Sequence, residues 1–234
     1  MDLQLNSGLD AKLLGDQYLV NNRLQVKDIF PIEQAEKTYQ CLATETPWGL
    51  FYRGEDEGKR IPAKKYQALS PEELQEIYKY IFETARDRYQ FMYLFNKLNL
   101  PDPSPKLFVH EIADFLNSEP VLAFIRTLTG IPEINCANAQ ATKYIGNCFL
   151  HPHTDEDEEY GRRVAYVLNM TKNWDPNWGG FLQFFNPDMN VIESFKPTFN
   201  VLNLFTVPKG HSVSFVAPFC SGERLSITGW FRDK

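Results

Sequence analysis

The chain has 234 residues, of which 43% are hydrophobic, so it can bury a substantial core in one large domain or in a domain with an added subdomain. Its formal net charge of −6 and its scattered basic residues argue against nucleic-acid binding, although a basic peptide remains compatible as a substrate. The sequence shows neither the layout of a signal peptide nor an apolar run of bilayer-spanning length, which predicts a cytoplasmic protein without a membrane partner.

The first half of the chain is expected to be mainly helical, with one early pair of strands. Residues 23–30 (RLQVKDIF) and 48–54 (WGLFYRG) have the composition of extended segments. Between them, Pro31 suits the start of a helix that continues to residue 46. The sequence therefore predicts a strand, a helix and a second strand before residue 55.

A long amphipathic helix is expected over residues 70–98. Ser70 can cap its start, Pro71 suits the first helical position, and Glu73 completes a capping box. A turn-rich break follows at residues 99–105. Two further helices are expected over residues 106–118 and 119–130.

The hydrophobic pattern of the sequence changes after residue 133. Short apolar or alternating runs divided by Gly, Pro, Asn and Asp are typical of an antiparallel sandwich or barrel. The sequence predicts an α+β fold, with a jelly-roll core (residues 134–234) braced by a mainly helical N-terminal layer (residues 1–133), in a single domain of residues 1–234. The runs are residues 134–145, 148–155, 162–170, 179–185, 190–196, 201–207, 211–217 and 224–231.

Residues 149–161 (FLHPHTDEDEEYG) hold two of the four histidines of the chain and five carboxylates. Residues two apart on a strand face the same side, so His153 and Asp155 can present an imidazole and a carboxylate to one cavity. The late His211 is the candidate for a third ligand. Two imidazoles and one carboxylate are the facial donor set of non-haem Fe(II) oxygenases. The alternative is a solvated acidic loop with structural histidines.

The last run, residues 224–231, predicts a strand that places Arg224 on the same face as Thr228 and Trp230. A guanidinium among core residues is costly to bury without an acceptor, because it does not lose its proton. Arg224 is therefore expected to bind a carboxylate, either from a ligand or from an acidic residue of the chain itself.

Together these residues resemble the prolyl hydroxylase type of Fe(II)- and 2-oxoglutarate-dependent dioxygenases. The resemblance covers roughly residues 140–232 and is specific because H-x-D, G-G-x-L, a distal histidine and R-x-S-x-x-x-W occur in this order. Residues 29–54 are weakly similar to the N-terminal region of bacterial members and of ribosomal-protein prolyl hydroxylases.

The resemblance implies residues for a metal site and for a co-substrate pocket. It implies Arg224 as the bidentate partner of the distal carboxylate of 2-oxoglutarate, and Tyr144 as a hydroxyl donor to that carboxylate. Thr228 and Trp230 match positions that line the same pocket. Asn169 departs from the hypoxia-sensing prolyl hydroxylases, which carry a tyrosine there. The implied catalytic iron ligands are His153, Asp155 and His211.

The resemblance also implies a double-stranded β-helix and an enzyme that uses Fe(II), 2-oxoglutarate and O2, with ascorbate as an optional reductant. The expected reaction is hydroxylation of a C–H bond of a prolyl residue in a peptide or protein, with release of succinate and CO2. A free amino acid or a small metabolite is the alternative substrate. Asp155 favours hydroxylation, because radical halogenases of this fold lack the carboxylate. The oligomeric state is not predicted.

Two other kinds of protein fit parts of the sequence. A cupin-type metal protein would use the H-x-H formed by His151 and His153, but it would also need a histidine at Val213. His151 is therefore expected to support the site or to lie at the surface. A β-sandwich that binds a partner through its many aromatic residues is the third reading, although aromatic residues in such numbers more often form a core.

Overall fold

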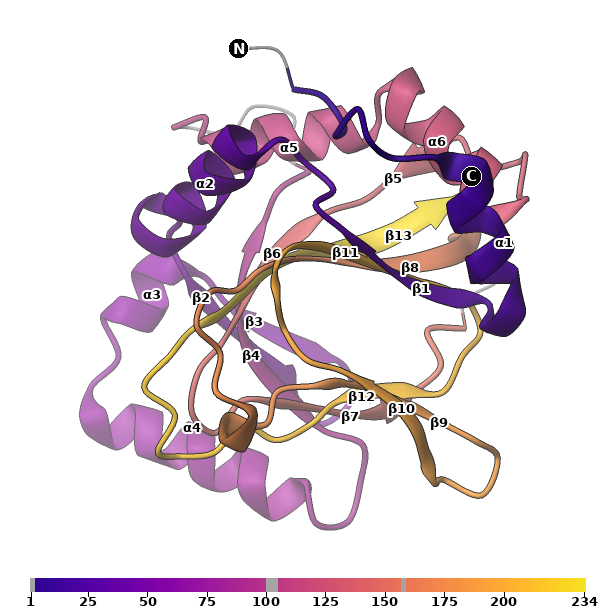
Figure 1. Cartoon of the computed structure of the whole chain (residues 1–234). Coiled ribbons are helices and arrows are strands. Elements are labelled where there is room, and N and C mark those ends of the chain that lie inside the picture. The colour runs from indigo at the N-terminus through magenta and orange to yellow at the C-terminus, as the bar shows by residue number, and fades with distance from the viewer. Residues whose placement is uncertain (1–2, 100–104, 157–158) are drawn as a thin grey trace.

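The computed structural model describes residues 3–99, 105–156 and 159–234, and its strands form one antiparallel sheet that curls into two facing layers (Figure 1). Along the main path the strand order is β1-β11-β8-β13-β6-β4-β7-β12-β9-β10. The described strands are β1 (Arg23–Lys27), β2 (Gly49–Arg53), β3 (Gly58–Ile61), β4 (Phe91–Lys97), β5 (Cys136–Ala137), β6 (Gln140–Tyr144), β7 (Phe149–His153), β8 (Arg162–Met170), β9 (Leu182–Phe185), β10 (Val191–Phe195), β11 (Phe199–Thr206), β12 (His211–Val213) and β13 (Arg224–Arg232).

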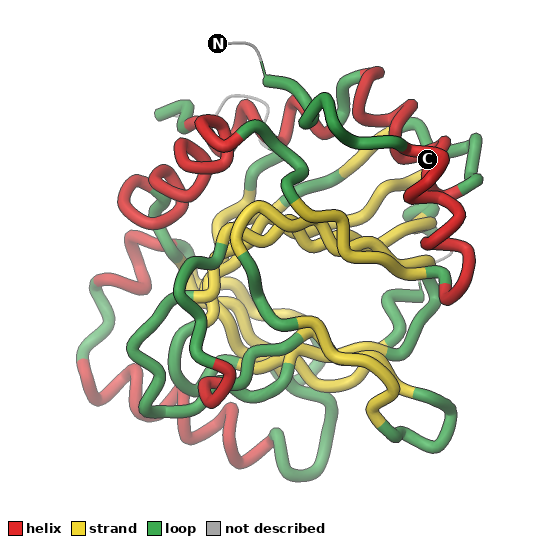
Figure 2. Tube along the Cα trace, in the orientation of Figure 1, coloured by secondary structure: helices red, strands yellow, loops and turns green. Residues whose placement is uncertain are grey.

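One layer of the sheet is covered by helices on its outer side, and the second layer faces it from below (Figure 2). The first layer contains β1, β11, β8, β13 and β6, and the second contains β7, β12, β9 and β10. β4 pairs with both β6 and β7, so it joins the two layers. The described helices are α1 (Ala11–Asn21), α2 (Ile32–Gln40), α3 (Ala63–Gln67), α4 (Pro71–Thr84), α5 (Phe108–Leu116) and α6 (Glu119–Thr129), with a π-helical turn at Cys41–Glu45 and a 3-10 turn at Pro176–Trp178.

Alternation along the strands of the first layer separates a helix-covered core from the interior between the layers. Outward residues of β8 and β13, such as Leu168 and Ile227, pack in one buried cluster with Ile112 of α5 and Ile125 of α6. Inward residues such as Val167 belong to a smaller cluster between the two layers. The outer face therefore stabilises the fold, while the inner face of the same strands is available for a site.

The architecture confirms the predicted α+β jelly roll braced by helices. Each of the eight C-terminal runs contains at least one strand, and the helices expected over residues 106–118 and 119–130 are α5 and α6. The capping box at Ser70 is present, with Glu73 N donating to Ser70 Oγ and Ser70 N donating to Glu73 Oε2. Within the described ranges, no helix combines the length and the apolar character needed to cross a bilayer.

The prediction of one helix over residues 70–98 is wrong. Helix α4 ends at Thr84, and Phe91–Lys97 is strand β4. Phe91 to Phe95 are all buried, because β4 is a central strand with neighbours on both sides. Aromatic residues favour such a strand, and tertiary packing overrides the helical periodicity that continues from α4.

The predicted pairing of the two early extended segments is also wrong. Strand β1 pairs with β11 at one end of the sheet, whereas β2 forms a hairpin with β3 and pairs with β4. Four strands that precede residue 134 thus join the sheet of the C-terminal region. Helices α1 and α3 were not predicted from the sequence.

Candidate functional site

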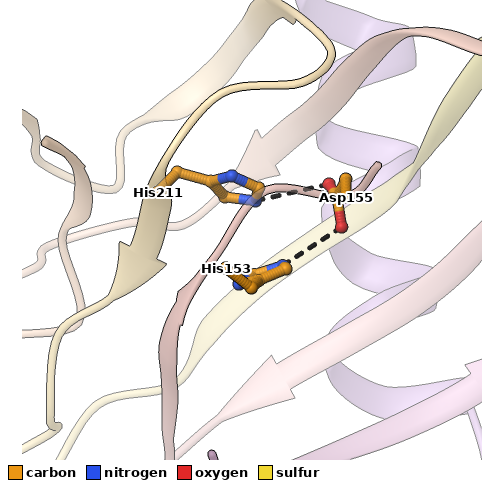
Figure 3. A group of neighbouring side chains, drawn as sticks. All are labelled: His153, Asp155 and His211. Carbon is orange, nitrogen blue, oxygen red and sulfur yellow. Dashed lines mark ion pairs between the residues drawn. The ribbon is translucent and has the colours of Figure 1, made fainter. Parts of the chain in front are cut away.

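Three side chains that carry typical metal-binding atoms converge between the two layers of the sheet (Figure 3). His153 ends β7, His211 begins β12, and the register of these strands places the two histidines opposite each other. Nε2 of His153 lies 3.1 Å from Oδ1 of Asp155, and Nε2 of His211 lies 3.3 Å from Oδ2. The three donor atoms lie within 4.8 Å of one another, which is close enough for one metal ion to contact all three.

Backbone carbonyl groups orient both imidazole rings. Nδ1 of His153 lies 3.0 Å from the carbonyl oxygen of His151, and Nδ1 of His211 lies 2.8 Å from that of Lys209. A carbonyl oxygen only accepts, so each Nδ1 carries a proton, and Nε2 is the ring atom that faces Asp155 and would bind a metal. The ring of Phe205 packs 4.5 Å from that of His211, between ring centroids. The two histidines are therefore held with Nε2 directed toward Asp155.

Asp155 reaches the histidines by a route that differs from the predicted strand alternation. Strand β7 ends at His153, and Asp155 lies beyond it with a left-handed backbone (φ 61°). The indole Nε1 of Trp230 donates a 3.0 Å hydrogen bond to Oδ2 of Asp155. Burial alone would raise the pKa of Asp155, but the two hydrogen-bonded imidazoles outweigh it and hold the pKa well below its ordinary value. Asp155 is thus a carboxylate at neutral pH.

His151 does not belong to this group of three, although it is close in sequence. Its Nδ1 accepts a 3.2 Å hydrogen bond from the backbone N–H of Gln90. Its own carbonyl oxygen is the group that orients His153. Partial burial lowers the pKa of His151. His151 therefore supports the site through its backbone.

Arg224 lies at the start of β13, 2% exposed, and its side chain is on the inner face of the sheet. No described carboxylate forms an ion pair with it, and its Nε has no hydrogen-bond partner among the described residues. Burial lowers the pKa of Arg224, and the nearby Tyr144 opposes this effect. Among the described residues, no acidic side chain takes the place of the carboxylate that the sequence predicted for Arg224, so a ligand carboxylate stays a prediction.

Tyr144 packs directly beside Arg224. The two residues are cross-strand partners in β6 and β13, and the guanidinium carbon lies 4.7 Å from the centre of the Tyr144 ring. Tyr93 of β4 stacks on the other side, with ring centroids 5.2 Å apart and an interplanar angle of 16°. Burial raises the pKa of Tyr144 well above its ordinary value, so its hydroxyl group is protonated and can donate.

The glycine pair of the G-G-x-L motif makes room for these groups. A Cβ atom at Gly180 would lie 3.5 Å from Cδ of Arg224 and 3.0 Å from Trp174, and Gly180 has a φ of 68°. At Gly179, whose φ is 71°, a Cβ would lie only 2.2 Å from the carbonyl oxygen of Phe215. Both positions thus require glycine for backbone conformation and for the close approach of neighbouring groups.

The residues present fit a divalent metal ion and a dicarboxylate. Two imidazoles and one carboxylate form the donor set of a mononuclear non-haem iron site with open positions. The unpartnered Nε of the buried Arg224 fits an anionic ligand in the same interior. Thr228, on the same face of β13 as Arg224 and Trp230, lies between them along the strand. The sequence-predicted residues therefore line one continuous inner face.

A family model matches the C-terminal part of the chain. Residues 139–232 match the model of the 2OG-Fe(II) oxygenase superfamily. The matched region contains all seven residues that the sequence assigned to the site.

The chain is similar in sequence to two curated prolyl 3-hydroxylases. The chain is 34% identical over 122 residues to prolyl 3-hydroxylase OGFOD1 of Mus musculus, an alignment that covers 48% of this chain and 22% of the relative. The corresponding protein of Xenopus laevis is 32% identical over 111 residues, which covers 42% of this chain and 21% of the relative. The chain therefore spans about a fifth of the length of the curated relatives it matches.

Solved structures extend the likeness in fold to nearly the whole chain. A Pseudomonas putida prolyl-4-hydroxylase aligns with a TM-score of 0.62 and 17% identity, covering 96% of this chain and 100% of that one. A Trichoplax adhaerens prolyl hydroxylase, solved with a hypoxia-inducible factor peptide, aligns with a TM-score of 0.57 and 18% identity, covering 95% and 89% of the two chains. At these identities the structures show a shared fold.

Sequence reasoning missed two kinds of residue near the donor triad. Tyr89 and Tyr93 were assigned to a helix, whereas Tyr89 packs near His153 and Tyr93 stacks on Tyr144. Asn203 was treated as an ordinary strand residue, although it faces the interior. A useful signal was available for Asn203, because a carboxamide within the apolar run VLNLFTV must be satisfied or must serve a ligand.

Proposed function

We propose that the chain is an Fe(II)- and 2-oxoglutarate-dependent dioxygenase that hydroxylates a prolyl residue of a peptide or protein and releases succinate and CO2. One observation carries the proposal: the donor triad and the unpartnered guanidinium of Arg224 share the interior of one jelly roll. The oxygenase family and the prolyl hydroxylases among its relatives support the same reaction.

In this proposal His153, Asp155 and His211 hold Fe(II). A bound Fe(II) ion would activate O2, the oxidant, with 2-oxoglutarate as the co-reductant, so that one oxygen atom would enter the C–H bond and the other would enter succinate. The protein groups keep the donors in place: the carbonyl oxygens of His151 and Lys209 hold the rings, and Trp230 holds the carboxylate of Asp155. Such support of the ligands determines how tightly the metal binds.

Arg224 and Tyr144 bind the far carboxylate of 2-oxoglutarate in this proposal. The guanidinium offers two parallel N–H donors to a carboxylate, and the protonated hydroxyl of Tyr144 adds a third donor beside it. Because Arg224 is 2% exposed, water competes little for these donors. The two residues thereby fix the distance and direction of the co-substrate relative to the triad.

Buried aromatic rings lie next to the donor triad. Phe184 and Phe205 are buried with ring centroids 5.2 Å apart, and Phe205 contacts His211. Exclusion of water strengthens the electrostatic contacts of the site and protects reactive species from side reactions. These rings therefore contribute to the reaction without exchanging protons.

We infer a peptide or protein substrate with hydroxylation at position 3 of the proline ring. The relatives that share 34% and 32% identity are named prolyl 3-hydroxylases, whereas the prolyl 4-hydroxylase shares 17% and supports the fold alone. The run of acidic residues from Asp155 to Glu159, which follows His153 in the sequence, favours a basic peptide. Ascorbate belongs to the proposal as an optional reductant.

The test is mass spectrometry of proline-containing proteins and peptides incubated with the enzyme, Fe(II), 2-oxoglutarate and O2. The expected result is a gain of one oxygen on proline, with stoichiometric succinate, and amino-acid analysis of the product gives 3-hydroxyproline. Free proline serves as the comparison substrate and is expected to remain unmodified. Repeating turnover with and without ascorbate tests its role.

His153→Ala is the matched negative control. Loss of one imidazole from the donor triad is expected to abolish both hydroxylation and succinate formation. Unchanged turnover in this variant would contradict the ligand assignment. If free proline is hydroxylated and peptides are not, the proposed peptide substrate is wrong, whereas the proposed hydroxylation reaction still holds.

A further inference from the structure

The inner face of the first layer carries a set of buried polar atoms without partners. Five of the eight buried side-chain nitrogen and oxygen atoms that lack a hydrogen-bond partner in the described residues belong to side chains on this face. Native proteins leave few such atoms, and each one usually marks a ligand or an ordered water molecule. The atoms are Gln25 Nε2, Asn169 Oδ1, Asn203 Nδ2, Asn203 Oδ1 and Arg224 Nε.

Asn203 is the residue of this set in which every polar side-chain atom lacks a partner among the described residues. Its side chain is 1% exposed, and both of its polar atoms lack a partner. It faces the interior, because its neighbours Leu202 and Leu204 pack outward in the helix-covered core. Burial of a carboxamide without partners costs the desolvation free energy of both its nitrogen and its oxygen atom. A bound ligand that forms hydrogen bonds with these two atoms would offset that cost.

Asn203 lies between the triad and the Arg224 end of the pocket. The next inward residue along β11 is Phe205, whose ring contacts His211. Across the sheet, Asn203 pairs with Val167 of β8, which in turn pairs with Thr228 of β13. Asn203 therefore stands one inward step, about 7 Å, from the residue that packs on the triad.

We propose that Asn203 is a binding residue for the dicarboxylate co-substrate, whose oxygen atoms accept from its carboxamide N–H groups. This inference rests on the proposed function and adds a polar contact that neither the family resemblance nor the sequence assigned. A ligand that extends from the triad toward Arg224 must pass the row formed by Asn203, Val167 and Thr228. A peptide substrate that approaches from the surface meets the triad first, so a residue as buried as Asn203 serves the small co-substrate.

Asn203→Leu separates this role from a structural one. The change keeps the approximate volume and removes both unpartnered atoms, so the ligand-free protein is expected to unfold at a higher temperature than the wild type. The same change is expected to raise the 2-oxoglutarate concentration at half-saturation about tenfold. The readout is the visible charge-transfer band formed in an anaerobic titration of the Fe(II)-loaded protein with 2-oxoglutarate.

A second variant and a control complete the experiment. Asn203→Asp preserves shape and places a carboxyl group against the ligand, so it is expected to weaken binding at neutral pH at least as much as Asn203→Leu. Asn135→Leu makes the same chemical change at an exposed carboxamide that bonds to the carbonyl oxygen of Asp233, and it is expected to bind 2-oxoglutarate like the wild type.

The outcomes distinguish this inference from the proposed function. A wild-type protein that shows no band overturns the proposed function and the inference with it. A wild-type band together with unchanged half-saturation in both Asn203 variants overturns the inference alone and assigns the carboxamide to buried water. Weaker binding in both variants, with a more stable ligand-free Asn203→Leu protein, supports it.

Discussion

The indole Nε1 of Trp230 donates a 3.0 Å hydrogen bond to the Oδ2 atom of Asp155, the same oxygen that lies 3.3 Å from His211. Asp155 lies outside β7 in a left-handed conformation, so strand pairing does not hold its side chain. Trp230, near the end of the long strand β13, takes over this task. One strand thus supports the donor triad with its end and presents Arg224 at its start.

Trp230→Phe is expected to weaken Fe(II) binding about tenfold, because loss of a hydrogen bond to a ligand typically costs ten- to a hundredfold in metal affinity. Anaerobic titration with Fe(II) measures the effect. Tyr166→Phe is the control, since it removes a buried aromatic donor to the carbonyl oxygen of Asn138 on the other face of the sheet. Tyr166→Phe is expected to reduce stability and to leave Fe(II) affinity intact. Equal affinities for all three proteins would show that Trp230 does not support the metal site.

Arg224→Lys is expected to raise the 2-oxoglutarate requirement at least tenfold while iron affinity stays near that of the wild type. Lysine keeps the positive charge but loses the planar pair of donors that grips a carboxylate. The measurement is succinate formation as a function of 2-oxoglutarate concentration. Arg126→Lys, at an ion pair with Glu119 in α6, is the matched control and should behave like the wild type. An unchanged 2-oxoglutarate requirement in Arg224→Lys would remove Arg224 from the co-substrate site.

The sequence predicted correctly those parts of the fold in which the local residue pattern and the tertiary contacts favour the same secondary structure. The capping box at Ser70 and the last strand, with Arg224, Thr228 and Trp230 on one face, depend on spacing of a few residues, and the structure contains both. The prediction for strand β4 was wrong because its aromatic residues continue the periodicity of α4. Only its pairing with β2 on one edge and with β6 and β7 on the other makes this segment a strand.

At the site, too, local spacing predicted some features, whereas contacts between distant segments determine others. H-x-D spacing brought His153 and Asp155 together correctly, but for a different reason than strand alternation, since the backbone turns left-handed at Asp155. No local pattern shows that the ring of Tyr89 lies near His153 or that Asn203 lacks partners. Both features depend on contacts between segments that are distant in the sequence. Such contacts leave no pattern of residue spacing that could be recognised in a single sequence.

Tyr18 is expected to make the stability of the fold sensitive to alkaline pH. Burial raises its pKa from 10.0 to about 12, against the lowering effect of its 2.7 Å hydrogen bond with Thr206. A raised folded-state pKa means that this contribution is complete below pH 10 and is lost as the pH rises from 10 to 12. The loss amounts to about 3 kcal/mol at most.

Urea unfolding of the wild type and of Tyr18→Phe, at several pH values between 8 and 12, measures this contribution. The stability difference between them is expected to shrink over the upper half of that range. Thr206→Val removes the hydrogen bond but keeps the titrating phenol, so it should retain the alkaline loss. A constant difference between wild type and Tyr18→Phe across the range would refute the assignment.

Tyr89 is expected to contact the substrate. It is 39% exposed, its ring centroid lies 5.8 Å from that of His153, and it packs against Phe91 at 5.9 Å. An exposed aromatic ring beside the triad offers a flat apolar surface to a proline ring. Tyr89→Ala should therefore raise the peptide concentration at half-saturation several-fold with little change in the 2-oxoglutarate requirement, whereas Tyr89→Phe, which keeps the ring, should stay close to the wild type. Phe219→Ala, a change at a 70% exposed aromatic residue outside the triad, is the control for general loss of surface area. If Tyr89→Ala and Phe219→Ala bind the peptide equally well, the substrate does not lie against Tyr89 and must approach the triad from another side.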